Sequence, residues 1–307
     1  MIDKNLIGLI SEKLNIERQE FIEKDIILQN LLSELSKNKD FFEKYSFKGG
    51  TCLIKCYLGY YRFSEDLDFT LIEGKHFIGK SGNAIRKMVS QEINKLLVLF
   101  EEIAKKTGLD FKAEKSNKQY LELGGGGRFT TFKLWYDSQI LNAKSFIKIQ
   151  INFVEQLMYS IKELEAKSLI NNNLYNEIKF VYSEYSYLNE KIIIKSYSIE
   201  EIFIEKVRAI LTRRGIKGRD FLDVYLIAIK KKIKPKDFKK QIIDKIVFML
   251  KYEKYANNLQ AKTKQFDAKF ELGKEKNLLL IPIPDEFDKF LKDFKKFLES
   301  IIKEIKK

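Results

Sequence analysis

"FKGGTCLIKCYLGYYRFSEDLDFTL", residues 47–71, joins a Gly49-Gly50-Thr51 turn to two alternating carboxylates, Asp66 and Asp68. The apolar residues after Thr51 predict a helix, and the alternating residues around Asp66 predict a strand. Side chains two residues apart on a strand point to the same face, about 6–7 Å apart. We therefore expect a short extended segment, a glycine turn, a helix, and then a strand with two carboxylates on one face.

The residue types in this stretch suit a nucleotide and its metal ion. A glycine turn before a helix offers bare backbone N–H groups and the positive end of the helix dipole, which attract anions. Two carboxylates can share divalent cations, and Mg²⁺ prefers carboxylate oxygens together with substrate phosphates. Such an arrangement serves phosphoryl or nucleotidyl transfer. Each feature alone is more often an ordinary turn or a solvated strand face, so the indication comes from their combination.

Composition sets the limits of the interpretation. The chain has 307 residues, 45% of them hydrophobic, which is enough for about two folded domains. No apolar run reaches the roughly 18 residues that span a bilayer, and the first residues lack a signal peptide's apolar stretch. We therefore expect a cytoplasmic protein with no membrane partner. One histidine and two cysteines are too few for a structural zinc site, which leaves carboxylates and lysines as the reactive groups.

The charge of the chain is strongly basic. The formal net charge is +14, and residues 230–307 hold 22 lysines, no arginine and 12 acidic residues. A basic balance of this size suggests a polyanionic partner such as a nucleic acid. Lysine, glutamate and isoleucine enrichment also marks the proteins of hyperthermophiles, where charge serves the surface. Charge alone leaves both readings open.

The pattern of the chain changes from mixed to helical near residues 190–198. Residues 82–107 predict a long helix that Gly108 ends. Ser198, followed by Glu201 three residues later, predicts a capping box that opens a helical half. Four strand-like stretches follow the long helix, at residues 109–116, 119–124, 127–137 and 145–155. We expect an α+β fold with a mixed sheet in residues 1–195 and a helical bundle in residues 196–307.

Two sequence blocks resemble a known family. The first is the glycine turn followed by R-x-S-x-D-x-D-F, formed here by Gly49, Gly50, Thr51, Arg62, Ser64, Asp66, Asp68 and Phe69. This block resembles the AbiEii-type toxins, also called the MenT family, of the DNA polymerase β-like nucleotidyltransferase superfamily. The second block, within residues 198–227, is similar to the family's downstream motif and supplies Lys206, Arg208, Arg219, Asp220 and Asp223. The resemblance covers residues 40–250.

The resemblance implies a fold, a reaction and roles for these residues. It implies a polymerase β-like nucleotidyltransferase core, with the basic helical domain completing the active site. Family members are toxins of type IV toxin–antitoxin pairs, encoded beside a winged-helix antitoxin. They use NTP and Mg²⁺ (or Mn²⁺) and attach nucleotides to the 3′ acceptor end of tRNA. The implied catalytic residues are Asp66, Asp68, Lys206 and Asp223, with the metal on Asp66 and Asp68; the implied substrate-binding residues are Gly49, Gly50, Thr51, Arg62, Ser64, Arg208 and Asp220.

The downstream residues leave two questions open. Asp220 either caps the first turn of its helix or reaches the site, whereas Asp223 is the stronger candidate for the site. Lys206 lies at the edge of the helix's buried face, about 100° from Val207, where a long side chain can reach a substrate. We expect Lys206→Ala to impair NTP kinetics with little change in melting temperature.

One position departs from the superfamily pattern. A third carboxylate commonly stands on a later strand, and here "IKIQIN" places Gln150 at that position. A glutamine can accept a hydrogen bond but cannot deprotonate a nucleophile. Either the block around Asp220 and Asp223 supplies the base, or this enzyme is slow or inactive.

Three other interpretations compete with an RNA-modifying enzyme. The chain could be a nucleotidyltransferase that modifies a protein or a small molecule, which the basic C-terminal half disfavours. It could be a non-catalytic nucleotide- or RNA-binding relative, which Gln150 favours. It could also be a helical structural protein whose D-x-D lies on the surface. Label from an α-³²P NTP would end on RNA for an RNA-modifying enzyme and on protein for a protein-modifying one. A non-catalytic relative would bind the nucleotide without incorporating label.

Overall fold

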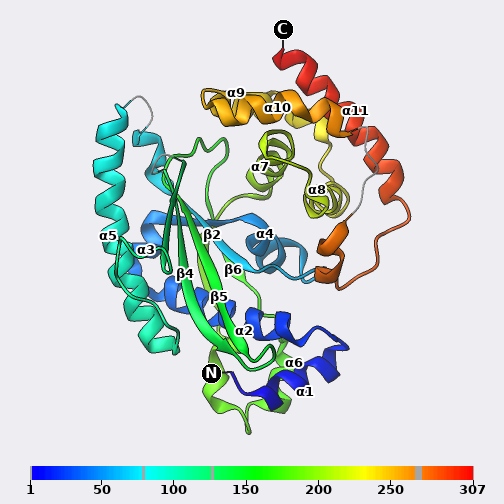
Figure 1. The fold of residues 1–307 in the computed structure, drawn as a ribbon. Coiled ribbons are helices and arrows are strands. Elements are labelled where there is room, and N and C mark those ends of the chain that lie inside the picture. The colour runs from blue at the N-terminus through cyan, green and yellow to red at the C-terminus, as the bar shows by residue number, and fades with distance from the viewer. Residues whose placement is uncertain (1, 78–79, 126–127, 267–271, 307) are drawn as a thin grey trace. The chain divides into compact units, whose positions relative to one another are not determined.

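The structure, a computed structural model, describes residues 2–77, 80–125, 128–266 and 272–306. The chain divides into two compact units (Figure 1). Met1–Glu155 with Ile161–Tyr197 forms the first, and Gln156–Ser160 with Ser198–Lys307 forms the second. In the described part of the chain, no helix is both long and apolar enough to cross a membrane.

The first unit is built on one mixed sheet of seven strands. Their order is β3-β4-β5-β2-β1-β7-β6. Strand β2 pairs antiparallel with β1 and parallel with β5, and β1 pairs parallel with β7. The mixed sheet that the sequence predicts is confirmed. The strands are β1 (Tyr45–Lys48), β2 (Asp66–Leu71), β3 (Leu121–Gly124), β4 (Phe129–Ser138), β5 (Ala143–Asn152), β6 (Lys162–Ala166) and β7 (Ile192–Ser196).

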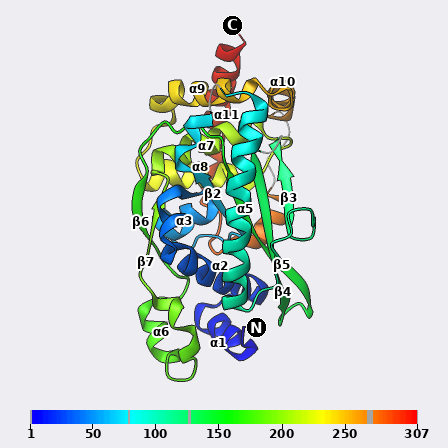
Figure 2. The ribbon, with the colours of Figure 1, turned by 90° about the vertical axis from the view of Figure 1, so that its left-hand side faces the viewer.

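Helices surround this sheet within the first unit. They are α1 (Lys4–Leu14), α2 (Gln19–Lys37), α3 (Lys39–Lys44), α4 (Gly49–Cys52), α5 (Gly82–Thr107) and α6 (Asn172–Ile178), with a π-helix η1 (Leu53–Leu58) and 3₁₀ turns η2 (Ile72–Phe77) and η4 (Ser183–Asn189). In Figure 1, α3 and α5 lie on one side of strands β4 and β5 and α4 lies on the other; Figure 2 shows α5 in front of the sheet.

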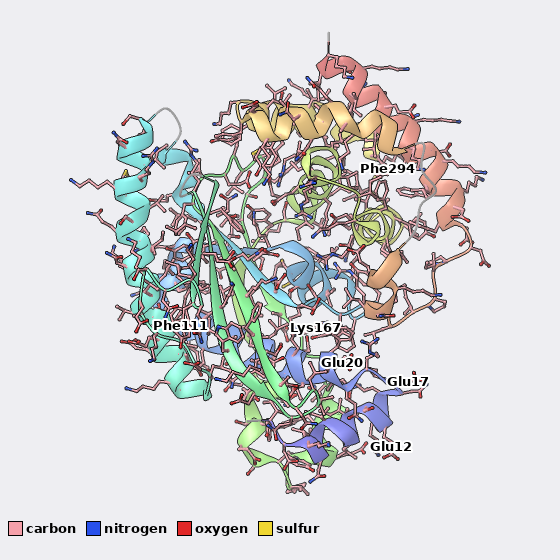
Figure 3. All side chains as sticks on the ribbon, in the orientation of Figure 1. Glu12, Glu17, Glu20, Phe111, Lys167 and Phe294 are labelled. Atoms are coloured by element: carbon pink, nitrogen blue, oxygen red, sulfur yellow. The ribbon has the colours of Figure 1, made fainter. Side chains whose placement is uncertain are left out.

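Aromatic residues fill the core between the sheet and α3 and α5. Phe69 of β2 meets Phe41 of α3 with ring centroids 4.9 Å apart, and Phe132 of β4 meets Phe100 of α5 at 4.6 Å. Phe111, labelled in Figure 3, packs edge-on against Phe100. All but Phe111 are at most 1% exposed. Burial of such rings is the main force that holds a sheet face to its helices.

The long helix is confirmed, and one predicted strand is wrong. Helix α5 begins after Ser81, whose hydroxyl accepts from Ala84 N, and ends at Gly108 in the left-handed conformation. Residues 109–116 form no strand; Asp110 alone makes a bridge, to Trp135. The amide of Ala113 instead donates to the Glu101 carboxylate at 2.8 Å. This side-chain acceptor replaces the ladder partner that a strand would need.

A buried ion pair fixes η1 to α2. The ammonium of Lys55, with a fully buried side chain, lies 3.1 Å from Asp25 Oδ1 and donates to Gln29 Oε1 at 3.0 Å. The Tyr60 hydroxyl donates to the same Asp25 carboxylate at 2.9 Å. A buried charge needs such partners to offset its desolvation. The chain between the glycine turn and β2 is therefore anchored at its middle.

The second unit is helical. Its elements are α7 (Ile199–Thr212), α8 (Gly218–Lys230), η5 (Pro235–Phe238), α9 (Lys239–Leu250), α10 (Glu253–Phe266), η6 (Gly273–Leu278) and α11 (Phe287–Ile305). Phe294 of α11, labelled in Figure 3, packs edge-on against Phe221 of α8 with centroids 6.1 Å apart.

Of the two hydrogen bonds in the capping box predicted for α7, one is confirmed and the other is wrong. Ser198 Oγ accepts from the amide of Glu201 at 3.2 Å, as an N-cap should. The Glu201 carboxylate does not return to the cap; it accepts from the amides of Met158 and Tyr159 and lies 2.5 Å from the ammonium of Lys245. Glu201 and Lys245 are fully buried, so a distant cation competes successfully for the carboxylate. The same bonds tie the segment Gln156–Ser160 to the helical unit.

Candidate active site

The turn between β1 and α4 places backbone directly against Asp68. Gly49 has φ +79°, in the left-handed region, which strains any residue with a Cβ. A Cβ on Gly49 would also lie 3.0 Å from the carboxyl carbon of Asp68, and one on Gly50 would lie 2.7 Å from Arg62 Nη2. Only glycine fits at position 49. Both predicted glycines therefore lie beside predicted site residues.

Asp66 and Asp68 lie on the same half-buried face of β2. In the sheet register, Asp68 stands between Lys48 of β1 and Gln150 of β5, and Asp66 stands beside Lys148 of β5. Gln150 therefore stands beside Asp68, at the position where the sequence resemblance leads us to expect a third acid. The two aspartates repel each other, so a cation is favoured between them.

Three further residues, Thr51, Ser64 and Arg62, make contacts at the glycine turn and the start of β2. The Thr51 hydroxyl donates to the backbone carbonyl of Asp66 and lies 2.8 Å from the Ser64 hydroxyl. Thr51 is 2% exposed and Arg62 is 1% exposed, and Arg62 Nη1 donates to the carbonyl of Phe63 at 2.8 Å. These contacts hold the glycine turn and the start of β2 together. Thr51 and Arg62 are thus buried where they position the turn and the strand; the substrate contact that the resemblance implies for them stays a prediction.

A buried ion pair beside Asp68 has no counterpart among the sequence-based predictions. Lys48, directly opposite Asp68 in the sheet, has its ammonium 3.6 Å from Glu155 Oε2 and 5.5 Å from the ring of Tyr197. Asn152 donates to the same Glu155 oxygen at 2.9 Å. Lys48 and Glu155 are 8% and 4% exposed. The pair places the Lys48 ammonium, with Glu155 as its counter-charge, in the row of Asp68. No local sequence signal points to it, because it depends on the register of β1 against β2.

The donor set fits a magnesium or manganese ion. No group of three or more histidine, cysteine, aspartate or glutamate side chains gathers as a metal site in the described ranges. Asp66 and Asp68 are two carboxylates on one half-buried face of β2 and could hold such an ion. Mg²⁺ is held in this way, by one or two carboxylates together with substrate phosphates and water.

The second predicted block forms a buried ion cluster in the helical unit. The ammonium of Lys206 lies 2.7 Å from Asp220 Oδ1 and 2.7 Å from Asp223 Oδ2, and Arg213 Nη1 lies 2.9 Å from Asp220 Oδ2. Burial alone would raise the pKa of Asp220, but Lys206 and Arg213 hold it below its usual value. Asp220 makes no cap for α8. The structure thus brings Lys206, Asp220 and Asp223 together.

These ion pairs overturn the expected thermal behaviour of Lys206→Ala. Asp220 and Asp223 are 2% and 0% exposed. Removing the ammonium would leave two buried carboxylates without it, and breaking one buried pair typically costs about 3–5 kcal/mol. The melting temperature of Lys206→Ala should therefore fall clearly. The sequence pattern places Lys206 at the edge of a helix and does not show these ion pairs.

Two other predicted cations of this block have acidic partners. Arg208, which is 8% exposed, donates to Glu205 Oε1 at 3.0 Å on the same helix. Arg219 lies 3.3 Å from Glu275 of η6, whose other oxygen accepts from the Arg219 amide. Neither ion pair shares a residue with the cluster around Lys206.

Lys262 of α10 is a further cation near Asp220. It is fully buried and donates to the carbonyl of Gly215. Burial first, and then repulsion by Arg213, lower its pKa from 10.5 to about 8. No sequence pattern distinguishes Lys262 from the other lysines of this helix.

The sequence profile of the family described as nucleotidyl transferase AbiEii toxin, type IV toxin–antitoxin system, matches residues 30–305. The chain belongs to the AbiEii family. It is therefore a nucleotidyltransferase of the toxin type, and the resemblance carried by the two sequence blocks is confirmed. No curated protein matches the chain by sequence.

Solved structures resemble this AbiEii chain over nearly its whole length. The nucleotidyltransferase toxin MenT4 from Mycobacterium tuberculosis is 14% identical with a TM-score of 0.50, and the match covers 97% of this chain and 98% of that one. JHP933 from Helicobacter pylori is 14% identical with a TM-score of 0.45, covering 93% of each chain. The likeness to MenT4 supports the fold, in agreement with the mixed sheet and the helical unit.

Gly49→Ala should abolish nucleotide transfer by this AbiEii enzyme. Alanine strains the left-handed backbone by about 1–2 kcal/mol, and its Cβ displaces the Asp68 carboxylate. We expect a lower melting temperature and at least a 100-fold loss of transfer. Gly59→Ala is the matched control, since Gly59 has φ +75° but open space around its Cβ. Equal residual activity in the two variants would show that the contact with Asp68 does not matter.

Lys262 should make stability depend on pH. Between pH 8 and 10.5 the unfolded chain keeps a proton that the folded chain has lost, so the free energy of unfolding rises with pH across this interval. The full penalty is present below pH 8. Urea unfolding at pH 7.5 and 9.5 should show this rise in the wild type and in Lys254→Met, an exposed lysine of the same helix. It should be smaller in Lys262→Met; parallel pH slopes would contradict the assignment.

Proposed function

We propose that this AbiEii enzyme transfers a nucleotide from NTP to RNA, at the 3′ acceptor end of tRNA, with Mg²⁺ on Asp66 and Asp68. The observation that carries the proposal is the apposition of the bare Gly49 backbone and the Asp68 carboxylate. Phosphate oxygens can lie against the glycine turn and reach a cation on Asp68 at the same time. When bound, the metal ion supplies charge neutralisation and polarisation of the reacting phosphoryl group.

We propose Lys206 of the helical unit as a further cation for the reaction. Asp220 and Asp223 each lie 2.7 Å from the ammonium of Lys206 and hold it in one orientation. We assign to these carboxylates the positioning of Lys206, and to Lys206 the stabilisation of charge that builds on the leaving pyrophosphate. A carboxylate whose pKa is lowered by bound cations is a poor base. Asp220 is therefore not the group that removes the proton of the acceptor hydroxyl.

Gln150 orients the acceptor in this proposal. Its side chain stands beside Asp68 on the same face of the sheet and can accept a hydrogen bond from the attacking hydroxyl. It cannot take the proton. The absence of a carboxylate at position 150 predicts a slow enzyme.

The proposed partners follow from the reaction. A toxin of a type IV pair has an antitoxin, and we propose a winged-helix protein encoded beside it. The net charge of +14 suits RNA, because cationic surfaces gain affinity for phosphate chains. We place the enzyme in the cytoplasm, where tRNA and NTP are available.

Replacing either metal carboxylate should stop the reaction. Asp66→Asn and Asp68→Asn should each lose at least 100-fold of α-³²P NTP incorporation into total tRNA, with melting temperatures close to that of the wild type, because both side chains are only half-buried. Asp137→Asn, an exposed residue of β4, is the control. Label on protein instead of tRNA would refute the RNA substrate, and full activity of either site variant would refute its metal role.

Gln150→Glu should accelerate transfer. A carboxylate at this position restores a general base, and such groups contribute at least tenfold to rates. We expect a kcat increase of about tenfold that grows as the new carboxylate ionises, with Gln139→Glu in the β4–β5 turn as the control. A slower Gln150→Glu enzyme would show that this position does not face the acceptor hydroxyl.

A further inference from the structure

The face of the sheet that bears Asp66 continues into an aromatic pair. Asp66 is in register with Lys148 of β5, which is opposite Lys133 of β4. The next pair on the same face of β4 and β5 is Trp135 with Phe146. Two residues along a strand correspond to about 6–7 Å, so this pair lies next to the Asp66 row. Both rings are half-buried and thus partly open.

The rings and the two lysines form one cluster. The Trp135 and Phe146 centroids are 4.7 Å apart, with planes inclined by 56°. The ammoniums of Lys133 and Lys148 each lie 5.6 Å from the Phe146 centroid. Trp135 Nε1 donates to the carbonyl of Gln119 at 3.0 Å, and Lys133 bridges to Glu122. The ring of Trp135 is thus held in one orientation, and Lys148 adds a half-exposed positive charge.

The ordinary role of a cross-strand aromatic pair is to stabilise its sheet. The hydrophobic core here is on the other face, where Leu134 and Ile147 are fully buried. A fixed, partly open aromatic surface flanked by lysines is the chemistry that binds single-stranded nucleic acid, through stacked bases and backbone phosphates.

We propose that Trp135, Phe146 and Lys148 form a stacking platform for the terminal bases of the acceptor RNA strand. The proposal rests on the proposed function, because it assigns the acceptor to one side of the metal carboxylates. Bases stack on the two rings, and the ammonium of Lys148 meets a backbone phosphate near Asp66.

The position of the platform indicates that it binds the acceptor RNA and not the incoming nucleotide. In nucleotidyl transfer the attacking and leaving oxygens lie roughly in line on opposite sides of the phosphorus. The glycine turn follows β1, on one side of β2, and the platform lies on β5 and β4, on the other. If the triphosphate lies against Gly49, the acceptor must enter from the β5 side.

Trp135 is the only tryptophan of the chain, so its fluorescence reports directly on the platform. Wild-type enzyme without NTP or metal is titrated with a single-stranded RNA that carries a tRNA 3′ end, and with the same RNA bearing two abasic terminal residues. The charges of the two strands are equal. We expect saturable quenching by the first and about tenfold weaker binding of the second. Equal quenching by both strands would overturn the platform.

Kinetics of variants separate the platform from the reaction itself. Phe146→Leu and Lys148→Met should each raise the apparent KM for RNA about tenfold and leave the KM for NTP unchanged. Lys162→Met, an exposed lysine on the edge strand β6, should change neither. Lys148→Met keeps the test intact if Phe146→Leu is unstable. An effect on the KM for NTP alone, or unchanged KM for RNA, would overturn the platform while RNA labelling continues; absence of RNA labelling in the wild type would refute the proposed function instead.

Discussion

The structure depends on one close approach, that of the Gly49 backbone to the carboxylate of Asp68. It needs a residue without a Cβ at a positive φ, and it needs β1 and β2 to be antiparallel neighbours in one fixed register. A shift of one residue would turn both aspartates into the aromatic core. Phe47 and Phe69, which are fully buried on the opposite face, prevent that shift. The core therefore fixes the chemistry of the open face.

Buried polar contacts then hold the candidate residues of each unit in place. Lys55 of η1 is ion-paired with Asp25, and the Thr51 hydroxyl donates to the carbonyl of Asp66 at the start of β2. The guanidinium of Arg62 occupies the space next to Gly50. In the helical unit, Lys206 is held by two buried carboxylates. Buried ion pairs give little net stability, but they fix a side chain in one orientation. A site that must bind a charged substrate in one geometry benefits from that.

Local sequence signals predicted the elements whose determinants are local. The amphipathic pattern and the flanking Gly108 were sufficient for α5, and the alternation around Asp66 was sufficient for β2. Strands β6 and β7 were not predicted, and residues 109–116 were wrongly given a strand, because pairing partners decide these segments. The candidate residues could be named from two sequence blocks, and their roles stay predictions. The burial of Arg62, the pair of Lys48 with Glu155 and the paired state of Lys206 depend on contacts between residues far apart in sequence.

Binding of Mn²⁺ followed by electron paramagnetic resonance tests the central claim most directly. Wild-type enzyme and Asp68→Asn are each titrated with Mn²⁺ in the presence of a non-hydrolysable NTP analogue. The account predicts bound Mn²⁺ with phosphorus hyperfine coupling in the wild type, because the ion would contact both the carboxylates and the phosphates that lie against Gly49. Asp68→Asn should lose this signal. The same signal in both proteins would contradict the account, since the metal and the nucleotide would then meet elsewhere.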